Sequence, residues 1–136
     1  MGMRIGEVSR RSGVPIPTIR FYETRELLTE PARSRSGYRA YSQDVLNELG
    51  FIRRAQRLGF TLDEIRDILS IGRGGKMPCA RVASLCAQHL DEIARKMEEL
   101  KEFQRNLREA ERLAKSGCGL TREGYCKAIA GASGCF

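Results

Sequence analysis

The chain has 136 residues, 41% of them hydrophobic and 30% charged, which is enough for one compact domain with an appendage. No apolar run approaches the roughly 20 residues that span a bilayer, and no apolar signal segment opens the chain, so we expect a cytoplasmic protein. The net charge of +7 lies mainly in residues 1–60, where eleven basic groups, all arginine, outnumber six acidic ones, as in a nucleic-acid-binding domain.

Two short helices joined by a tight turn are predicted near the start of the chain. Residues 5–12 carry apolar side chains three positions apart, and Gly13 after them is a natural helix stop. Pro17 suits the first position of a second helix, which continues to about Glu26. The pair predicts a helix-turn-helix, with Phe21 expected in its core.

A turn-rich segment follows. Residues 33–41 read Arg-Ser-Arg-Ser-Gly-Tyr-Arg-Ala-Tyr, with alternating side chains and a glycine in the middle. This pattern predicts a two-stranded wing. Its three arginines and two tyrosines suit contacts with phosphates and insertion into a DNA groove.

Two more helices are predicted before the first break in the chain. Ser42 is expected to cap the first of them, which ends near Gly59. Its apolar stripe consists of Val45, Leu46, Leu49, Ile52 and Ala55. Thr61 and Glu64 predict a capping box for the second helix. The three glycines within residues 72–75 then break the chain, and we place the end of the DNA-binding domain there.

A long helix is predicted over residues 80–115, where nothing interrupts a helical pattern. Apolar and small residues recur there at alternating steps of three and four and form a stripe that we call the seam. The seam consists of Val82, Cys86, His89, Ile93, Met97, Leu100, Phe103, Leu107, Ala110 and Ala114. A helix of this length spans about 54 Å and cannot bury its seam alone. We therefore expect a homodimer, with folding back onto the chain's own N-terminal domain as the alternative.

The predicted organisation has four parts. Residues 1–72 form a winged helix-turn-helix DNA-binding domain, which we call the head, and residues 73–79 form a hinge. Residues 80–115 form the dimerisation helix. Residues 116–136 form a glycine-containing loop and a short tail, in which Ala128-Ile129-Ala130 can make one helical turn.

Five stretches of the sequence carry a family resemblance. They are Arg4-Ile5-Gly6-Glu7-Val8, Thr18-Ile19-Arg20-Phe21-Tyr22-Glu23, Ser36-Gly37-Tyr38-Arg39-Ala40-Tyr41, Phe51-Ile52-Arg53-Arg54-Ala55 and Leu58-Gly59-Phe60-Thr61-Leu62-Asp63-Glu64-Ile65. In order and spacing they resemble the MerR family of transcriptional regulators, and the resemblance covers nearly the whole chain. It implies a mainly α-helical fold, with a winged helix-turn-helix head, an antiparallel coiled-coil dimerisation helix and a short effector-binding tail.

The resemblance also implies a mechanism. Regulators of this family sit, together with RNA polymerase, on promoters whose spacer is too long. Effector binding bends and untwists the DNA until the two polymerase elements align. By position, DNA contacts are implied for Thr18, Arg20, Tyr22, Arg35, Tyr38, Arg39 and Arg54. For Tyr22 the alternative is packing in the core, and Tyr41 is expected to pack there.

Five cysteines, all beyond residue 78, point to metal or redox chemistry, because a cytosolic chain keeps its thiols reduced. Within one chain the predicted helix separates Cys79 from Cys118 by about 50 Å, whereas sulfurs bound to one ion lie within about 4 Å of each other. In an antiparallel dimer, Cys79 lies beside the partner's Cys118 and the partner's Cys126. We therefore expect a three-thiolate metal site between protomers, with residues 116–136 as the metal-binding loop and tail. The heavy-metal branch of the family implies the same ligands.

Soft thiolates select mercury, cadmium, lead, zinc or monovalent copper over hard cations. In the family, a cysteine at the position of Cys79 marks the branch that senses divalent ions. A three-sulfur site favours mercury, with cadmium, lead and zinc as alternatives. The seven residues between Cys118 and Cys126, however, resemble the loop of monovalent copper sensors. Cys86 is expected to be a small seam residue, His89 a packed residue or an auxiliary ligand, and the role of Cys135 stays open.

Other classes of function fit the sequence less well. An iron–sulfur sensor of the same fold would need four cysteines close together in the tail, and a metal buffer would leave the arginine-rich wing without a role. An enzyme is not expected, because the chain has one histidine, no phosphate-binding glycine loop and no nucleophile–base pair that we can place. The main alternative is a redox or monovalent copper sensor of the same fold.

Overall fold

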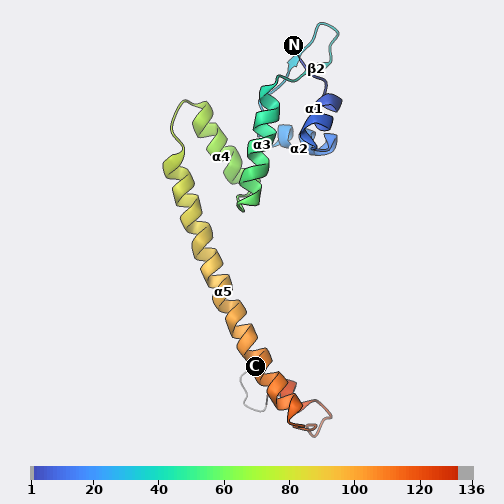
Figure 1. Ribbon diagram of the computed structural model, residues 1–136, viewed down its shortest axis with the longest axis vertical. Helices are drawn as coiled ribbons and strands as arrows, with labels where there is room; N and C mark the ends of the chain where they lie inside the picture. The colour runs from blue at the N-terminus through green and yellow to red at the C-terminus, as the bar shows by residue number, and fades with distance from the viewer. Residues whose placement is uncertain (1, 132–136) are drawn as a thin grey trace. The chain divides into compact units, whose positions relative to one another are not determined.

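The computed structural model describes residues 2–131 of the chain, which are mainly helical (Figure 1). It divides into two compact units, Met1–Ala87 and Gln88–Phe136, and each unit is described by itself. Among the described residues, none of the helices is both long enough and apolar enough to cross a membrane.

The first unit begins with the predicted helix-turn-helix, formed by α1 (Ile5–Ser12) and α2 (Ile16–Thr24). Gly13 ends α1 in the left-handed conformation, with φ 75°, which glycine adopts without a steric penalty. Pro17 is the second residue of α2, one position later than predicted. The helix also ends two residues earlier than predicted, because Glu26 has a positive φ of 60° that an α-helix does not tolerate.

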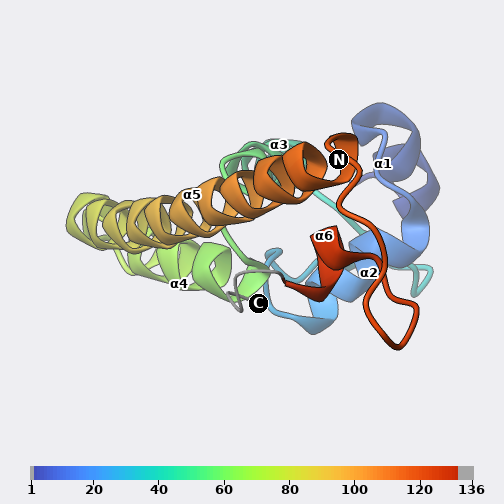
Figure 2. The same ribbon diagram turned by 90° about the horizontal axis from the view of Figure 1, so that it is seen from below.

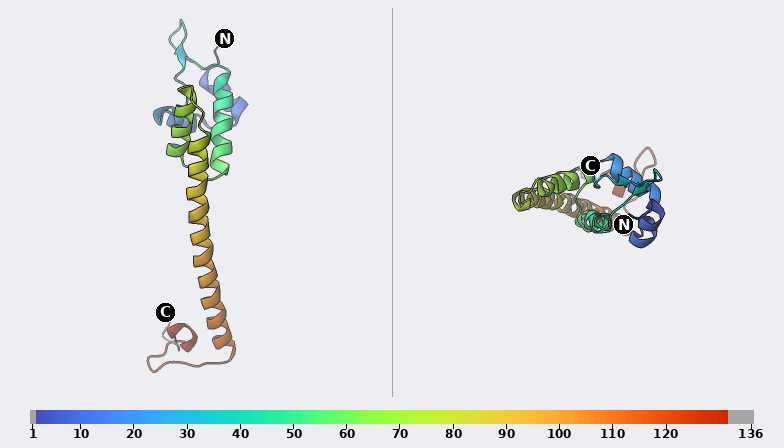
Figure 3. Two further views of the ribbon diagram at one scale, coloured as in Figure 1. Left: turned by 90° about the vertical axis from the view of Figure 1, so that its left-hand side faces the viewer. Right: turned by 90° about the horizontal axis from the view of Figure 1, so that it is seen from above.

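The predicted wing is present as an antiparallel pair of short strands, β1 (Ala32–Arg33) and β2 (Arg39–Ala40). Its turn projects beyond the helices of the first unit (Figure 3). Just after β2, Tyr41 forms an isolated antiparallel bridge with Met3, through backbone hydrogen bonds of 2.7 and 2.8 Å. The N-terminal segment is therefore hydrogen-bonded to the residue that follows β2 and extends the wing by a third, very short strand-like segment.

The close contact between this N-terminal segment and the wing gives a first testable prediction. A Cβ atom at Gly2 would overlap the Cβ atom of Ala40 and lie 3.0 Å from its Cα atom. We expect Gly2→Ala to lower the free energy of unfolding by about 1–3 kcal/mol, because the backbones must move apart. The matched control is Gly6→Ala in α1, where nothing lies within 4 Å of the added atom.

The control is expected to raise the free energy of unfolding by up to about 1 kcal/mol, because alanine is the better helix former. Urea unfolding at one fixed protein concentration measures both changes. Equal effects of the two substitutions would show that the contact between Gly2 and Ala40 is not tight in solution.

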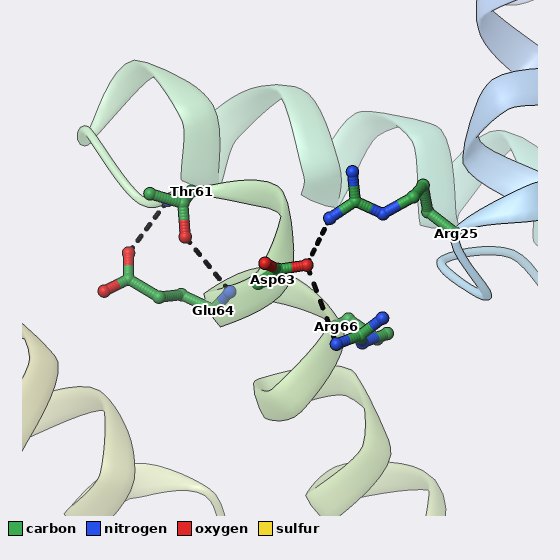
Figure 4. A network of polar contacts seen from close by, with 5 residues as sticks. All are labelled: Arg25, Thr61, Asp63, Glu64 and Arg66. Carbon is green, nitrogen blue, oxygen red and sulfur yellow. Dashed lines mark hydrogen bonds and ion pairs between the residues drawn. The ribbon is translucent and has the colours of Figure 1, made fainter.

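Two longer helices complete the first unit, α3 (Asp44–Arg57) and α4 (Leu62–Arg73). The capping box of α4 is present as predicted (Figure 4): Glu64 N–H donates to Thr61 Oγ1 at 3.2 Å, and Thr61 N–H donates to Glu64 Oε1 at 2.8 Å. The predicted cap of α3 was wrong. The N-cap residue is Gln43 rather than Ser42, and it has no side-chain cap, so the helix starts from its backbone alone.

The core of the first unit lies where α1, α2, α3 and α4 meet. Its buried apolar residues are Met3, Val8, Val14, Ile19, Tyr22, Leu27, Leu28, Tyr41, Val45, Leu49, Ile52, Ala55, Phe60, Ile65, Ile68 and Leu85. The predicted α3 stripe is confirmed, with Leu46 partly buried. Phe21 was expected in the core but is 46% exposed, because the inward face of α2 is taken by Ile19 and Tyr22, three positions apart.

The predicted long helix is present as α5 (Cys79–Lys115), one residue longer at its start than predicted. It begins in the first unit, where Leu85 is its one buried residue. Leu85 is not a seam position. Most of α5 belongs to the second unit, where α6 (Lys127–Ala130) forms the predicted helical turn after a loop (Figure 2).

Candidate DNA-binding groove and thiol loop

A groove of about 370 Å³ lies between α2 and the wing. It is lined by Arg4, Ile5, Arg20, Tyr38, Arg39 and Tyr41. The guanidinium of Arg4 stacks over the ring of Tyr38, with its central carbon 4.1 Å from the ring centroid. Three arginines with aromatic walls form a concave surface that suits a polyanion, and it lies where the sequence placed the DNA contacts.

The arginines of the first unit fall into two groups. Some are bound within the protein: Arg53 donates to the carbonyls of Ser12 and Gly13 at 3.3 and 3.1 Å and so closes the end of α1. Others are exposed, and their guanidinium groups make no hydrogen bond or ion pair with another described residue; these include Arg20, Arg35 and Arg54. The second group is available to a ligand and includes three of the predicted contact residues.

The side chains of the remaining predicted DNA-contact residues are buried, half-buried or already paired with other residues. Tyr22 is only 7% exposed, and its hydroxyl donates to Gln56 Oε1 at 3.3 Å, so its ring packs in the core. Thr18 and Tyr38 are half-buried. Arg39 lies 2.6 Å from the carboxylate of Glu23. From the sequence, Glu23 was noted only as part of a stretch that carries the family resemblance and was given no role, because sequence spacing does not reveal its partners Arg39 and Tyr41.

Tyr41 packs in the core as expected, with 1% of its surface exposed. Its hydroxyl donates to Glu23 Oε1 at 2.6 Å. Burial, the hydrogen bond to Glu23 and the negative charge of Glu23, in decreasing order of effect, together raise the pKa of Tyr41 to about 12. The neutral phenol is therefore the form that the fold holds.

The second unit contains a loop that joins two of the predicted metal ligands. Cys118 is half-buried and Cys126 is exposed, and both are free thiols. Leu120 and Cys126 form an antiparallel bridge, and Lys127 N–H donates to the Gly119 carbonyl at 3.1 Å. Gly119 has a φ of 84°, which lets the chain turn sharply beside the first thiol. The loop is therefore closed by backbone hydrogen bonds between the residues adjacent to the two cysteines.

The third predicted ligand lies elsewhere in the chain. Cys79 is the first residue of α5 and is exposed, as is Cys86. Within residues 2–131, no cluster of three or more potential metal ligands occurs in the single chain. The single chain thus brings together two of the three predicted ligands at most. Cys135 lies outside the described residues.

Comparison with known proteins identifies the family. The family model described as "MerR HTH family regulatory protein" matches residues 3–70, and the model "MerR, DNA binding" matches residues 46–110. The mercuric resistance operon regulatory protein of Bacillus cereus is 41% identical over 107 residues, which are 79% of this chain and 81% of that protein. The chain belongs to the MerR family. It is therefore a transcriptional regulator and not an enzyme.

Solved structures of MerR-family regulators resemble this one. The lead(II) complex of the regulator PbrR691 from Ralstonia metallidurans CH34 has a TM-score of 0.73 and 39% sequence identity, covering 81% of this chain and 86% of that one. The mercury(II) complex of MerR from Bacillus megaterium MB1 has a TM-score of 0.62 and 34% identity, covering 94% and 96%. These likenesses confirm the predicted mainly helical fold with its wing and long helix.

In this MerR-family chain the seam of α5 is largely exposed. The exposed large apolar side chains on α5 are Leu90, Ile93, Met97, Leu100, Phe103 and Leu107. Along the second unit, Met97, Leu100, Phe103 and Leu107 line one shallow apolar groove together with the stems of Lys101 and Gln104. An apolar surface of this kind on a helix calls for a partner surface.

Proposed function

We propose that this MerR-family regulator binds promoter DNA as a homodimer and activates transcription when a thiophilic metal ion binds to its cysteines. The observation that carries the proposal is the closed loop between Cys118 and Cys126, in a chain whose other unit carries an arginine-lined groove. The first feature suits a soft metal ion and the second suits DNA. One chain therefore contains both a candidate metal site and a candidate DNA-binding surface, as a metal-responsive regulator requires.

On the DNA side, we propose that Arg20 on α2 reaches base edges in the major groove, with Thr18 beside this contact. Tyr22, whose ring packs in the core, is not proposed as a DNA contact. We propose that Arg35, Tyr38 and Arg39 of the wing, together with Arg54, contact the phosphate backbone. Support comes from the exposure of Arg20, Arg35 and Arg54 and from the position of the groove. Phosphate contacts fix the orientation of the protein, and base contacts select the sequence.

This assignment predicts the effect of Arg20→Ala on promoter binding. The loss of a base contact by arginine costs about 1–3 kcal/mol, so the dissociation constant is expected to rise about 5- to 150-fold. Arg108→Ala on α5 is the control, because it removes the same charge from an exposed residue outside the head. Fluorescence anisotropy with labelled promoter DNA measures both. Equal, small effects of the two variants would refute a specific contact by Arg20.

On the metal side, we propose that Cys79 of one protomer completes the site with the partner's Cys118 and the partner's Cys126. Antiparallel pairing of α5 would supply this arrangement, and the exposed seam supports such pairing. Three thiolates suit mercury(II) or lead(II), and the similar solved structures contain those two ions. Mercury is the favoured effector, with cadmium, lead and zinc as alternatives; His89 and Cys86 are not needed as ligands.

Metal binding would then change transcription by changing the shape of the promoter DNA. We propose that it alters the relative orientation of the two heads in the dimer, and that the heads bend and untwist the promoter so that RNA polymerase can engage both of its elements. The energy needed to deform DNA is on the order of several kcal/mol and depends on the DNA sequence, so a change in how strongly the protein deforms the promoter can control transcription.

The test is a titration of the reduced dimer with mercury, lead, cadmium and zinc, followed by thiolate-to-metal absorption in the ultraviolet. One tightly bound ion per shared site is expected, and its binding should be lost when Cys79 is replaced by serine. Tight binding of none of these ions would refute metal sensing by divalent ions while leaving the assignment as a DNA-binding regulator intact.

A second candidate effector is monovalent copper. The loop between Cys118 and Cys126 is closed by backbone hydrogen bonds within one unit, and we propose that its two thiols hold such an ion without help from Cys79. Two soft thiolates are sufficient to bind such an ion. If Cys79→Ser keeps full affinity for copper(I) while it loses mercury binding, monovalent copper is favoured as the effector.

A further inference from the structure

Glu23 occupies an unusual place for a carboxylate in a DNA-binding domain. Its side chain is only 9% exposed, on α2 three positions after Arg20 and next to the groove between α2 and the wing. Both of its oxygens lie close to residues at the end of the wing: Oε1 accepts the Tyr41 hydroxyl at 2.6 Å, and Oε2 forms an ion pair with Arg39 Nη2 at 2.6 Å that lacks hydrogen-bond geometry. One acidic side chain therefore joins α2 to β2.

The wing needs such a connection. Each of its strands has only two residues, and a two-stranded hairpin is at best marginally stable by itself. Its orientation must come from contacts with the rest of the unit. The contacts that join it to the rest include the Met3–Tyr41 bridge, the stacking of Arg4 on Tyr38 and the pair of contacts to Glu23. Of these, the Glu23 contacts are the ones that reach α2.

The geometry around Arg39 extends the argument. Its side chain is 44% exposed and lines the groove, although one of its nitrogens is engaged by Glu23. A guanidinium has five N–H donors in a fixed planar fork, so it can bind a buried carboxylate along one edge and a phosphate along another. The ammonium group of lysine is a point charge and cannot reproduce this bridging geometry.

We propose that Glu23 is a positioning residue for DNA recognition: it holds Arg39 at the angle needed for a phosphate contact and fixes the wing relative to α2. This inference rests on the proposed DNA binding. It opposes the simplest electrostatic expectation, in which a negative charge beneath a DNA-binding groove only weakens binding and its removal improves affinity.

The first test is Glu23→Gln, which keeps the size of the side chain and an acceptor for Tyr41 but removes the charge that holds Arg39. The probe is a DNA duplex selected from a random library by the wild-type protein, and the dissociation constant is measured over a series of salt concentrations. We expect binding to weaken about tenfold and the salt dependence to lose up to about one phosphate contact, because Arg39 is released. Glu26→Gln is the control: it removes an exposed carboxylate just after α2 and should change affinity by less than about twofold.

A second pair of variants tests the link to Arg39. Arg39→Gln should weaken binding as much as Glu23→Gln does, and the double variant should be no weaker than either single variant, because both remove one interaction unit. Arg39→Lys should bind as weakly as Arg39→Gln. As an independent sign that the contact exists in solution, Glu23→Gln should lower the pKa of Tyr41 from about 12, while burial keeps it above its ordinary value.

The outcomes separate the possible failures. If the wild-type protein selects no duplex from the library, the proposed DNA binding itself is wrong. If the wild type binds but Glu23→Gln binds equally well or more tightly with a steeper salt dependence, the positioning role is wrong. The role is also refuted if Arg39→Lys retains full affinity, and this variant decides the matter even if Glu23→Gln lowers the thermal stability of the protein.

Discussion

Replacement of Leu100 by glutamate is expected to convert the proposed dimer into monomers and to abolish specific DNA binding. Leu100 is 65% exposed in the single chain and lines the apolar groove of α5. Burial of a leucine side chain contributes about 1.5–3 kcal/mol to the free energy of association. In a symmetric dimer the substitution removes this contribution twice, once from each protomer. Because two carboxylates would also enter an apolar interface, association should weaken by more than about 100-fold.

Sedimentation equilibrium measures this change, and Arg105→Glu is the control. Arg105 lies about half a helical turn away from the seam and is exposed, so glutamate there should leave the dimer intact. If the wild-type protein is itself monomeric at micromolar concentration, the alternative in which α5 folds back onto its own head gains support.

The second large effect concerns the cysteines. Cys79→Ser, Cys118→Ser and Cys126→Ser are each expected to abolish metal-dependent activation while DNA binding persists. A sharper experiment is co-expression of Cys79→Ser with Cys118→Ser. If each site takes Cys79 from one protomer and the loop thiols from its partner, the mixed dimer has one intact site and one site that lacks two ligands. We therefore expect the mixture to regain metal binding, with one ion per mixed dimer, although neither variant binds metal alone.

A site within one chain would give the opposite result, because both sites of the mixed dimer would then lack one thiol. Recovery of binding thus distinguishes a shared site from a site within one protomer, and its absence would contradict the shared arrangement. Cys86→Ser is the matched control: Cys86 is also an exposed thiol on α5, and its replacement should leave activation nearly unchanged. Mass spectrometry under native conditions gives the number of ions per dimer.

Local sequence signals predicted most of the helices of this chain. Gly13, the capping box of Thr61 and Glu64, and the stripe of α3 each act over a few residues, and the structure contains all of them. The errors arose where tertiary packing chooses between local options. Apolar residues follow one another along α2, so the sequence did not reveal which of them faces inward, and Phe21 is exposed as a result. Leu85 was missed for a similar reason, because the seam spacing favoured its neighbour Cys86.

The candidate sites were predicted less completely than the helices. The wing and its arginines follow from composition, but the division between bound and unbound arginines depends on partners far away in the sequence, such as Gly13 for Arg53. The role of Glu23 depends in the same way on Tyr41, which is 18 residues away. The glycines of the thiol loop predict its turns, but the sequence does not show which backbone groups pair to close it. Contacts of this kind require a three-dimensional arrangement.

The basic residues that line the groove between α2 and the wing are arginines, and the first lysine of the chain is Lys76. Enzymes that acetylate lysine therefore have no side-chain substrate in the head and cannot neutralise its groove. Amine-reactive dyes, surfaces and cross-linkers will likewise couple to side chains only from residue 76 onward. The protein can thus be immobilised or labelled through its lysines with the side chains that line the groove chemically untouched.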